Sequence, residues 1–83
     1  MEYLKSVIPV IESNYVNFTT VERSIADFFI YNREQMDFSA KSVAGKLFVS
    51  EASLSRFAKK CGFRGYREFI YQYEENFVVR QDS

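Results

Sequence analysis

The sequence predicts an all-α fold, a compact bundle of about five short helices that contains a helix-turn-helix. Three observations lead to this prediction. Apolar residues recur at helical spacing along the chain, capping residues stand between the apolar segments, and no segment alternates apolar and polar residues as a strand does. The chain has 83 residues, of which 47% are hydrophobic, and this suits one small domain with a single core. We therefore expect residues 1–83 to form one domain.

The first helix is predicted from a cap and a stripe of apolar residues. Ser6 can serve as the N-cap, which places Pro9 in the first turn, where its missing N–H costs no hydrogen bond. The stripe at helical spacing consists of Leu4, Val7, Ile8, Ile11 and Tyr15. We expect this stripe to face the core.

The second helix is predicted from about residue 20 to residue 33. Thr19 and Glu22 fit a capping box, in which each side chain accepts a hydrogen bond from the other residue's backbone N–H. The inward stripe of this helix is expected to consist of Val21, Ile25, Phe28 and Phe29.

The third and fourth helices are predicted on either side of a short turn at 48–50. Ser39 begins the third helix, and Ser50 is the N-cap of the fourth, which extends over about 50–61. Gly62 suits the left-handed position that follows a helix. The inward residues of the third helix are Val43, Ala44 and Leu47. Those of the fourth are Leu54, Phe57, Ala58 and Cys61.

The last helix begins near Gly65 and is apolar on more than one side. Its main stripe consists of Tyr66, Phe69, Ile70, Tyr73 and Phe77. Tyr71, Val78 and Val79 point elsewhere. A helix that is apolar on two sides usually has a second partner, so this helix predicts a contact with another domain or subunit.

The segment from Ala40 to Lys59 fits the helix-turn-helix template. The small Ala44 stands where the two helices cross closely, and the locking apolar positions are filled by Val43, Leu47, Val49, Leu54 and Phe57. One position departs from the template, because Phe48 occupies the place in the turn that is usually glycine. If its φ angle is positive, a bulky residue there costs about 1 kcal/mol or more.

Charge is divided unevenly along the chain although the net charge is zero. Residues 39–67 carry seven basic residues and one acidic residue, whereas 1–38 carry three basic and six acidic residues and 68–83 carry one basic and four acidic residues. This asymmetry is typical of a surface that meets a charged partner, and it predicts an anionic partner for the middle third.

The outer face of the predicted fourth helix has the character of a DNA-recognition surface. Ala52, Ser55, Arg56 and Lys59 follow one another at helical spacing opposite the apolar stripe. Small side chains allow close approach to the major groove, and the forked donor of Arg56 can bind guanine. The residues predicted to contact double-stranded DNA are Ser50, Glu51, Ala52, Ser53, Ser55, Arg56, Lys59 and Lys60.

Other classes of function find little support in the sequence. The chain has no histidine and one cysteine, so neither a zinc site nor a Cys–His nucleophile is expected, and we predict no metal, no cofactor and no enzymatic activity. Cys61 lies on an apolar stripe and is expected to be a buried hydrophobic residue. No apolar run is long enough to cross a membrane, and no signal peptide is indicated. The alternative to DNA binding is a helix-turn-helix that binds another protein. This alternative predicts apolar side chains on the outer face of the fourth helix.

Two stretches of the sequence resemble the N-terminal domain of the RpiR family, the phosphosugar-responsive transcription regulators of bacteria. The first runs from Val49 to Phe57 (VSEASLSRF) and the second from Lys59 to Phe69 (KKCGFRGYREF). The segment 19–26, with its T-x-x-E-R start, resembles that family's second helix. The departures are Ser53 for the usual threonine, Cys61 for leucine, and Phe48 in the turn.

The resemblance implies a helical, homeodomain-like domain and sequence-specific DNA binding by a regulator of sugar or phosphosugar metabolism. Members of this family carry a C-terminal domain of the sugar-isomerase type that binds the phosphosugar. We therefore expect the 83-residue chain to be a fragment of a longer regulator, with the effector bound only through the missing domain. A homodimer is expected for the full-length protein, because operators of such modules are commonly two half-sites. The resemblance also implies a cytoplasmic location at the bacterial nucleoid.

Overall fold

The computed structural model describes residues 7–82, with side chains described for 7–76. Within this range the chain is helical and contains no strand. The elements are α1 (Val7–Asn14), the short 3₁₀ helix η1 (Tyr15–Asn17), α2 (Thr20–Tyr31), α3 (Ala40–Leu47), α4 (Glu51–Lys60) and α5 (Tyr66–Asp82). The all-α prediction is confirmed. The predictions made for Leu4, Ser6 and the side chains of Phe77, Val78 and Val79 fall outside the described residues.

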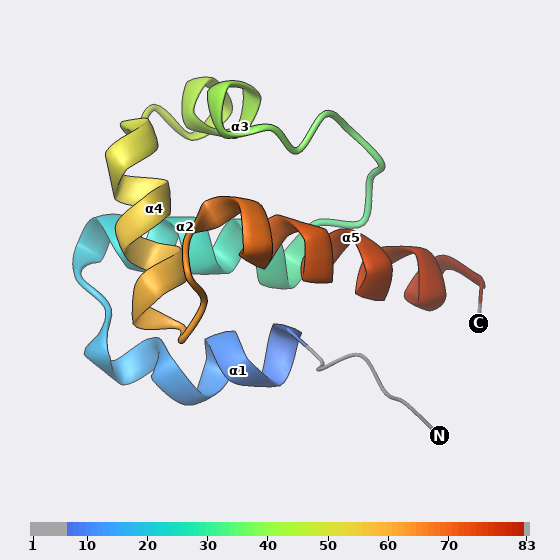
Figure 1. The fold of residues 1–83 in the computed structure, drawn as a ribbon, viewed down its shortest axis with the longest axis horizontal. Helices are drawn as coiled ribbons and strands as arrows, with labels where there is room; N and C mark the ends of the chain where they lie inside the picture. Colours follow the sequence, from blue (N-terminus) through green and yellow to red (C-terminus); the bar gives the residue numbers. More distant parts are fainter. Residues whose placement is uncertain (1–6, 83) are drawn as a thin grey trace.

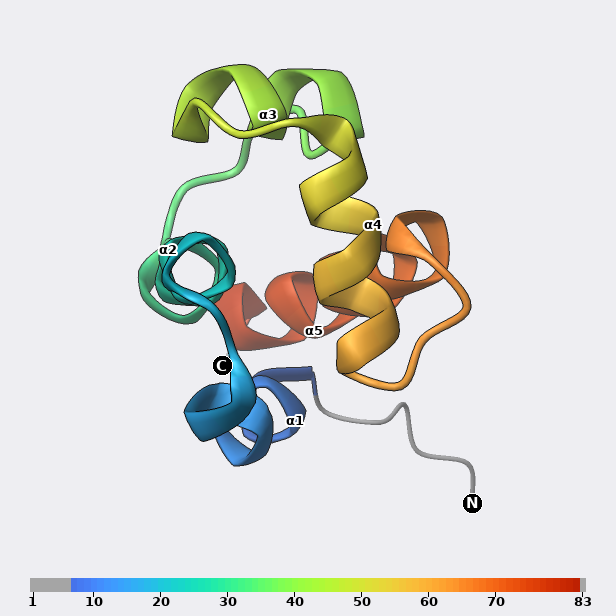
Figure 2. The same ribbon diagram turned by 90° about the vertical axis from the view of Figure 1, so that its left-hand side faces the viewer.

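The helices are arranged with α3 at one end of the molecule and α1 at the other (Figure 1). Helices α2, α4 and α5 lie between them, and the same order is visible after the molecule is turned by 90° (Figure 2). Helix α4 packs against α2, α3 and α5, and α1 packs against α2 and α5. One side of α4 is therefore enclosed by three helices, which leaves its opposite side for solvent or a partner.

Aromatic side chains fill the centre of the bundle around Phe29, which is fully buried. Its ring centroid lies 4.9 Å from that of Phe69 and 4.8 Å from that of Tyr73, both in edge-to-face arrangements. The hydroxyl of Tyr73 donates a hydrogen bond to the carbonyl oxygen of Phe29 at 3.1 Å. Phe57 of α4 stacks on Phe29 at 6.2 Å, so the same cluster holds α4 in place.

The predicted helix starts are confirmed by their hydrogen bonds. In the capping box of α2, Thr19 Oγ1 accepts from the Glu22 N–H at 3.2 Å, and Glu22 Oε1 accepts from the Thr19 N–H at 2.9 Å. The hydroxyl of Ser39 caps α3, and that of Ser50 caps α4. Gly62, directly after the C-cap of α4, has the positive φ of 98° that its predicted position requires.

The described residues of the predicted stripes mostly face the core. Of the α1 stripe, Val7 and Ile11 are fully buried, and the entire α4 stripe is buried. The last helix also matches its prediction at Tyr71, which lies off the main stripe and is 60% exposed.

The structure differs from the sequence predictions at two points in α2. The helix ends at Tyr31 and not at 33, because the side chain of Asn32 exchanges two hydrogen bonds with the backbone of Glu34, at 2.9 and 3.3 Å, and so competes with the helix. Val21 was expected to face the core but is 46% exposed, whereas Glu22 is only 7% exposed. The first turn of α2 places its capping carboxylate, and not the neighbouring apolar residue, against the rest of the bundle.

Candidate nucleic-acid interface

The turn between α3 and α4 completes the helix-turn-helix that the sequence predicts. Phe48 ends α3 in the left-handed conformation, with φ 58° and ψ 43°. The N–H groups of Phe48 and Val49 both donate to the carbonyl oxygen of Ala44, the latter at 3.0 Å. Ser50 then returns to an extended conformation, and its Oγ accepts from the Ser53 N–H at 3.0 Å. Ala44 is 7% exposed, as the predicted close crossing of the two helices requires.

Helix α4 separates an apolar side from a polar side. Its inward residues lie in the core, while Ala52, Arg56 and Lys59 are exposed and Ser55 is half-buried. Glu51, the first residue of the helix, is also exposed, at the end where the helix dipole favours an acid. The structure thus brings the predicted residues of this face together on one accessible side of α4.

The guanidinium of Arg56 lies against the N-terminal half of α4. Its Nη2 donates to Ser53 Oγ at 3.3 Å, and the hydroxyls of Ser53 and Ser50 share a hydrogen bond of 2.9 Å. A hollow of about 210 Å³ adjoins this group, between α4 and the start of α2. It is lined by Thr19, Val21, Glu22, Ser53 and Arg56. Both serine hydroxyls already form hydrogen bonds, and that of Ser50 caps α4, so a phosphate would compete with those bonds.

Lys60 is held by α2 and not left on the open face of α4. Its Nζ lies 2.8 Å from Glu22 Oε1 and donates to the carbonyl oxygen of Asn17 at 3.2 Å. Burial alone would raise the pKa of Glu22, but the hydrogen bonds from Lys60 and from the Thr19 backbone outweigh it, so its pKa lies below the ordinary value. Lys60 therefore connects α4 to the capping box of α2.

The predicted contact residue Lys59 and four further basic residues that were not predicted as contacts are available on the surface. Lys59 on α4 is exposed and forms no ion pair or side-chain hydrogen bond among the described residues. Lys41 and Lys46 on α3 are exposed, as are Arg64, two residues before α5, and Arg67 in the first turn of α5. The charge count along the sequence included all of them, but the contact residues were predicted for the fourth helix alone, so the four flanking cations were not assigned.

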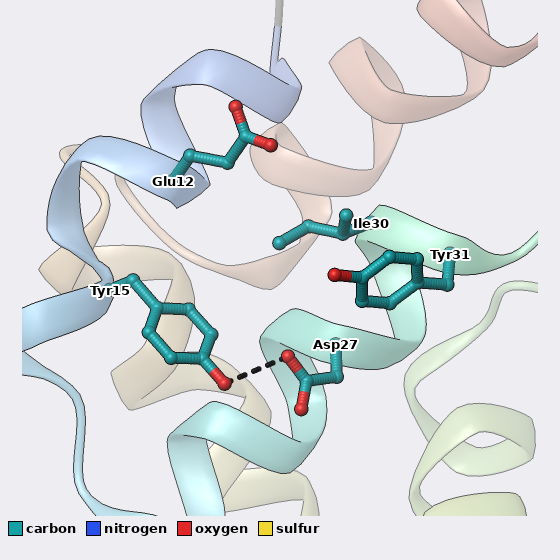
Figure 3. A pocket seen from close by; sticks show the side chains of 5 residues that line it. All are labelled: Glu12, Tyr15, Asp27, Ile30 and Tyr31. Atoms are coloured by element: carbon teal, nitrogen blue, oxygen red, sulfur yellow. Dashed lines mark hydrogen bonds between the residues drawn. The ribbon is translucent and has the colours of Figure 1, made fainter.

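In contrast to the basic residues around α4, a hollow of about 470 Å³ between α1 and α2 carries two carboxylates (Figure 3). It is lined by Glu12, Tyr15, Asp27, Ile30 and Tyr31. The Tyr15 hydroxyl donates to Asp27 Oδ1 at 2.9 Å, and this hydrogen bond raises the pKa of Tyr15. An acidic hollow repels phosphate, so this part of the surface is unsuited to the DNA backbone.

Three further findings bear on other kinds of site. No group of three or more His, Cys, Asp or Glu residues arranged to hold a metal ion occurs among the residues that the structure describes. Within the same part of the chain, no helix is long and apolar enough to span a membrane. Cys61 is buried, and burial, with a smaller contribution from the charge of Glu22, raises the pKa of its thiol to about 11. A thiol of this kind is poorly reactive at neutral pH.

Comparison with known protein families identifies the kind of domain. The sequence pattern of the helix-turn-helix domain of the rpiR family matches residues 5–78, which cover α1 to most of α5. No curated protein matches the chain. The family match covers nearly the whole sequence and includes both helices of the helix-turn-helix. The chain therefore belongs to the rpiR family of helix-turn-helix domains and is a DNA-binding transcription regulator of that kind.

Proposed function

We propose that the domain inserts α4 into the major groove of duplex DNA and thereby recognises an operator sequence. The observation that carries this proposal is the exposed polar side of α4 directly opposite its buried stripe. A protein-binding helix-turn-helix would be expected to present apolar side chains there. Arg56 and Lys59 are exposed on this side instead, which supports DNA as the partner.

The residues of this side would have different roles. Ala52 and Ser55 are small enough to let the helix approach the bases, and Arg56 would leave Ser53 to donate two hydrogen bonds to guanine. Glu51 would accept from cytosine, and Lys59 would contact a phosphate. Contributions from Ser50, Ser53 and Lys60 require the loss of bonds that the free domain already makes, so we expect these three to contribute less.

The first experiment is a titration of the domain against a fluorescent random-sequence duplex at several salt concentrations. One module of this size brings about four to six cations to phosphates, so log K should fall with log salt with a slope of about −4 to −5. Absence of binding at low salt, or a slope near zero, would contradict the proposal.

The second experiment separates base recognition from phosphate contact. Arg56→Ala should cost about 1–3 kcal/mol on duplexes selected by the wild-type domain, and much less on random DNA. Lys59→Ala is the matched control, because it removes an exposed charge from the same side of the helix and should weaken both DNAs about equally. If the two variants behave alike on both DNAs, Arg56 does not recognise bases.

We further propose that the domain acts within a dimeric bacterial regulator of sugar or phosphosugar metabolism at the nucleoid. A separate domain of the sugar-isomerase type would bind the phosphosugar effector and supply tight dimerisation. Family membership supports this proposal, and so does the 60% exposed Tyr71 on α5, which suits a weak contact with a second subunit. Sedimentation of the chain and of Tyr71→Ser over a concentration series tests that contact. A strict monomer at millimolar concentration would assign dimerisation entirely to other parts of the regulator.

A further inference from the structure

Phe48 is the residue whose side chain the fold itself does not explain. It is the one non-glycine residue with a positive φ among the described residues. Its side chain is 94% exposed, more than any other large hydrophobic residue in that part of the chain. The left-handed conformation is unfavourable for a residue with a Cβ atom, and a phenyl ring in water recovers nothing by burial.

The turn requires the conformation of this residue but not its side chain. Two N–H groups, those of Phe48 and Val49, must reach the carbonyl oxygen of Ala44 so that the chain can leave α3 and arrive at the Ser50 cap. Glycine satisfies this geometry without strain and is the usual residue at such helix ends. Phenylalanine therefore stands at a position where the folding of this domain favours glycine.

The position of the turn relates Phe48 to the proposed DNA interface. The connection between α3 and α4 crosses the same side of the molecule as α4 (Figure 2), and Phe48 lies three residues before the first residue of α4. The exposed Lys46 precedes it, within a segment that carries seven basic residues and one acidic residue. These charges attract an anionic surface and disfavour the same face of a second copy.

We propose that Phe48 packs against an apolar group of duplex DNA at the major groove, either a thymine methyl group in the groove or a deoxyribose ring at its edge. This inference rests on the proposed function and adds a residue outside α4 to the recognition surface. Thymine methyl groups are the apolar contacts that the major groove offers to such side chains. The strain that the free domain carries at Phe48 would be offset by a contact made only in the complex.

The test compares the stability and the DNA affinity of the Phe48→Gly variant. Removal of the left-handed strain should raise Tm by about 4–8 °C. Affinity for duplexes selected by the wild-type domain should fall about fivefold or more at fixed salt, because one buried apolar contact is lost. A variant that is more stable yet binds more weakly is the expected result. Phe48→Tyr keeps both the ring and the strain, so its Tm and affinity should stay near those of the wild type.

The matched control is Tyr31→Ser, which removes another exposed aromatic side chain, on α2, that is 72% exposed. It should leave DNA affinity unchanged. If wild-type protein binds DNA and Phe48→Gly binds equally well, the inference fails while the proposed function stands. If wild-type protein does not bind DNA, both fail. If Phe48→Gly instead abolishes self-association seen by sedimentation of the wild type without changing DNA affinity, the partner is a second copy and the inference is wrong.

Discussion

Replacing Lys60 with methionine should destabilise the domain, whereas the same change at the neighbouring Lys59 should not. Methionine keeps most of the aliphatic length of lysine and removes the charge. Lys60 lies 2.8 Å from the carboxylate of Glu22, whose side chain is 9% exposed, while Lys60 itself is 37% exposed. Without Lys60, the carboxylate is left with the backbone N–H of Thr19 as its partner at 2.9 Å.

The expected cost lies between two known limits. Exposed ion pairs contribute about 0.2–1 kcal/mol, and breaking a fully buried pair costs about 3–5 kcal/mol. Because Lys60 is more than one third exposed, solvent screens the pair, and we expect a loss of about 1–3 kcal/mol. For a domain of this size, each kcal/mol corresponds to a fall in Tm of about 4–8 °C.

Urea and thermal unfolding of four proteins measure this effect: the wild type, Lys60→Met, Glu22→Gln and the double variant. Glutamine can still accept from the Thr19 N–H, so the double variant should recover part of the lost stability, with a coupling energy of about 1 kcal/mol. Lys59→Met should unfold like the wild type. In DNA binding it should make the slope of log K against log salt less steep by about 0.9, because one cation no longer contacts a phosphate. Equal stability of Lys59→Met and Lys60→Met, or a coupling energy of zero, would refute the role of the ion pair.

Three further predictions concern single residues. Gly45→Ala should raise the free energy of unfolding by about 1 kcal/mol in urea titrations, because Gly45 lies within α3 with no atom within 4 Å of an added Cβ; an unchanged value would contradict this. Cys61 should react with iodoacetamide at pH 8 only after unfolding, since its thiol is buried with a pKa near 11, and rapid labelling of the folded protein would be the contrary result. The pKa of Glu22 is lowered from 4.5, so its contribution to stability is present above that pH and is lost as pH falls toward the lower folded value. Acid unfolding curves of Glu22→Gln should lack that part of the decline.

The starts of α2, α3 and α4 could be predicted from the sequence because capping is local. The hydrogen bonds of Thr19, Ser39 and Ser50 join atoms three residues apart, and residue types alone indicate them. The buried stripe of α4 was predictable for a similar reason, since helical periodicity places its four members on one side. The polar side of α4 follows from the same periodicity.

Contacts between helices were decided only by the tertiary structure. Lys60 and Glu22 are 38 residues apart in the sequence, and nothing local indicates that the crossing of α2 and α4 brings them together. Packing between helices likewise decides that Glu22, and not Val21, is the buried residue in the first turn of α2. Phe48 shows most clearly which features the sequence predicts and which the tertiary structure decides. The sequence raised the question of its φ angle, but the strained backbone and the exposed ring follow from how α3 must end for Val49 and Ser50 to reach α4.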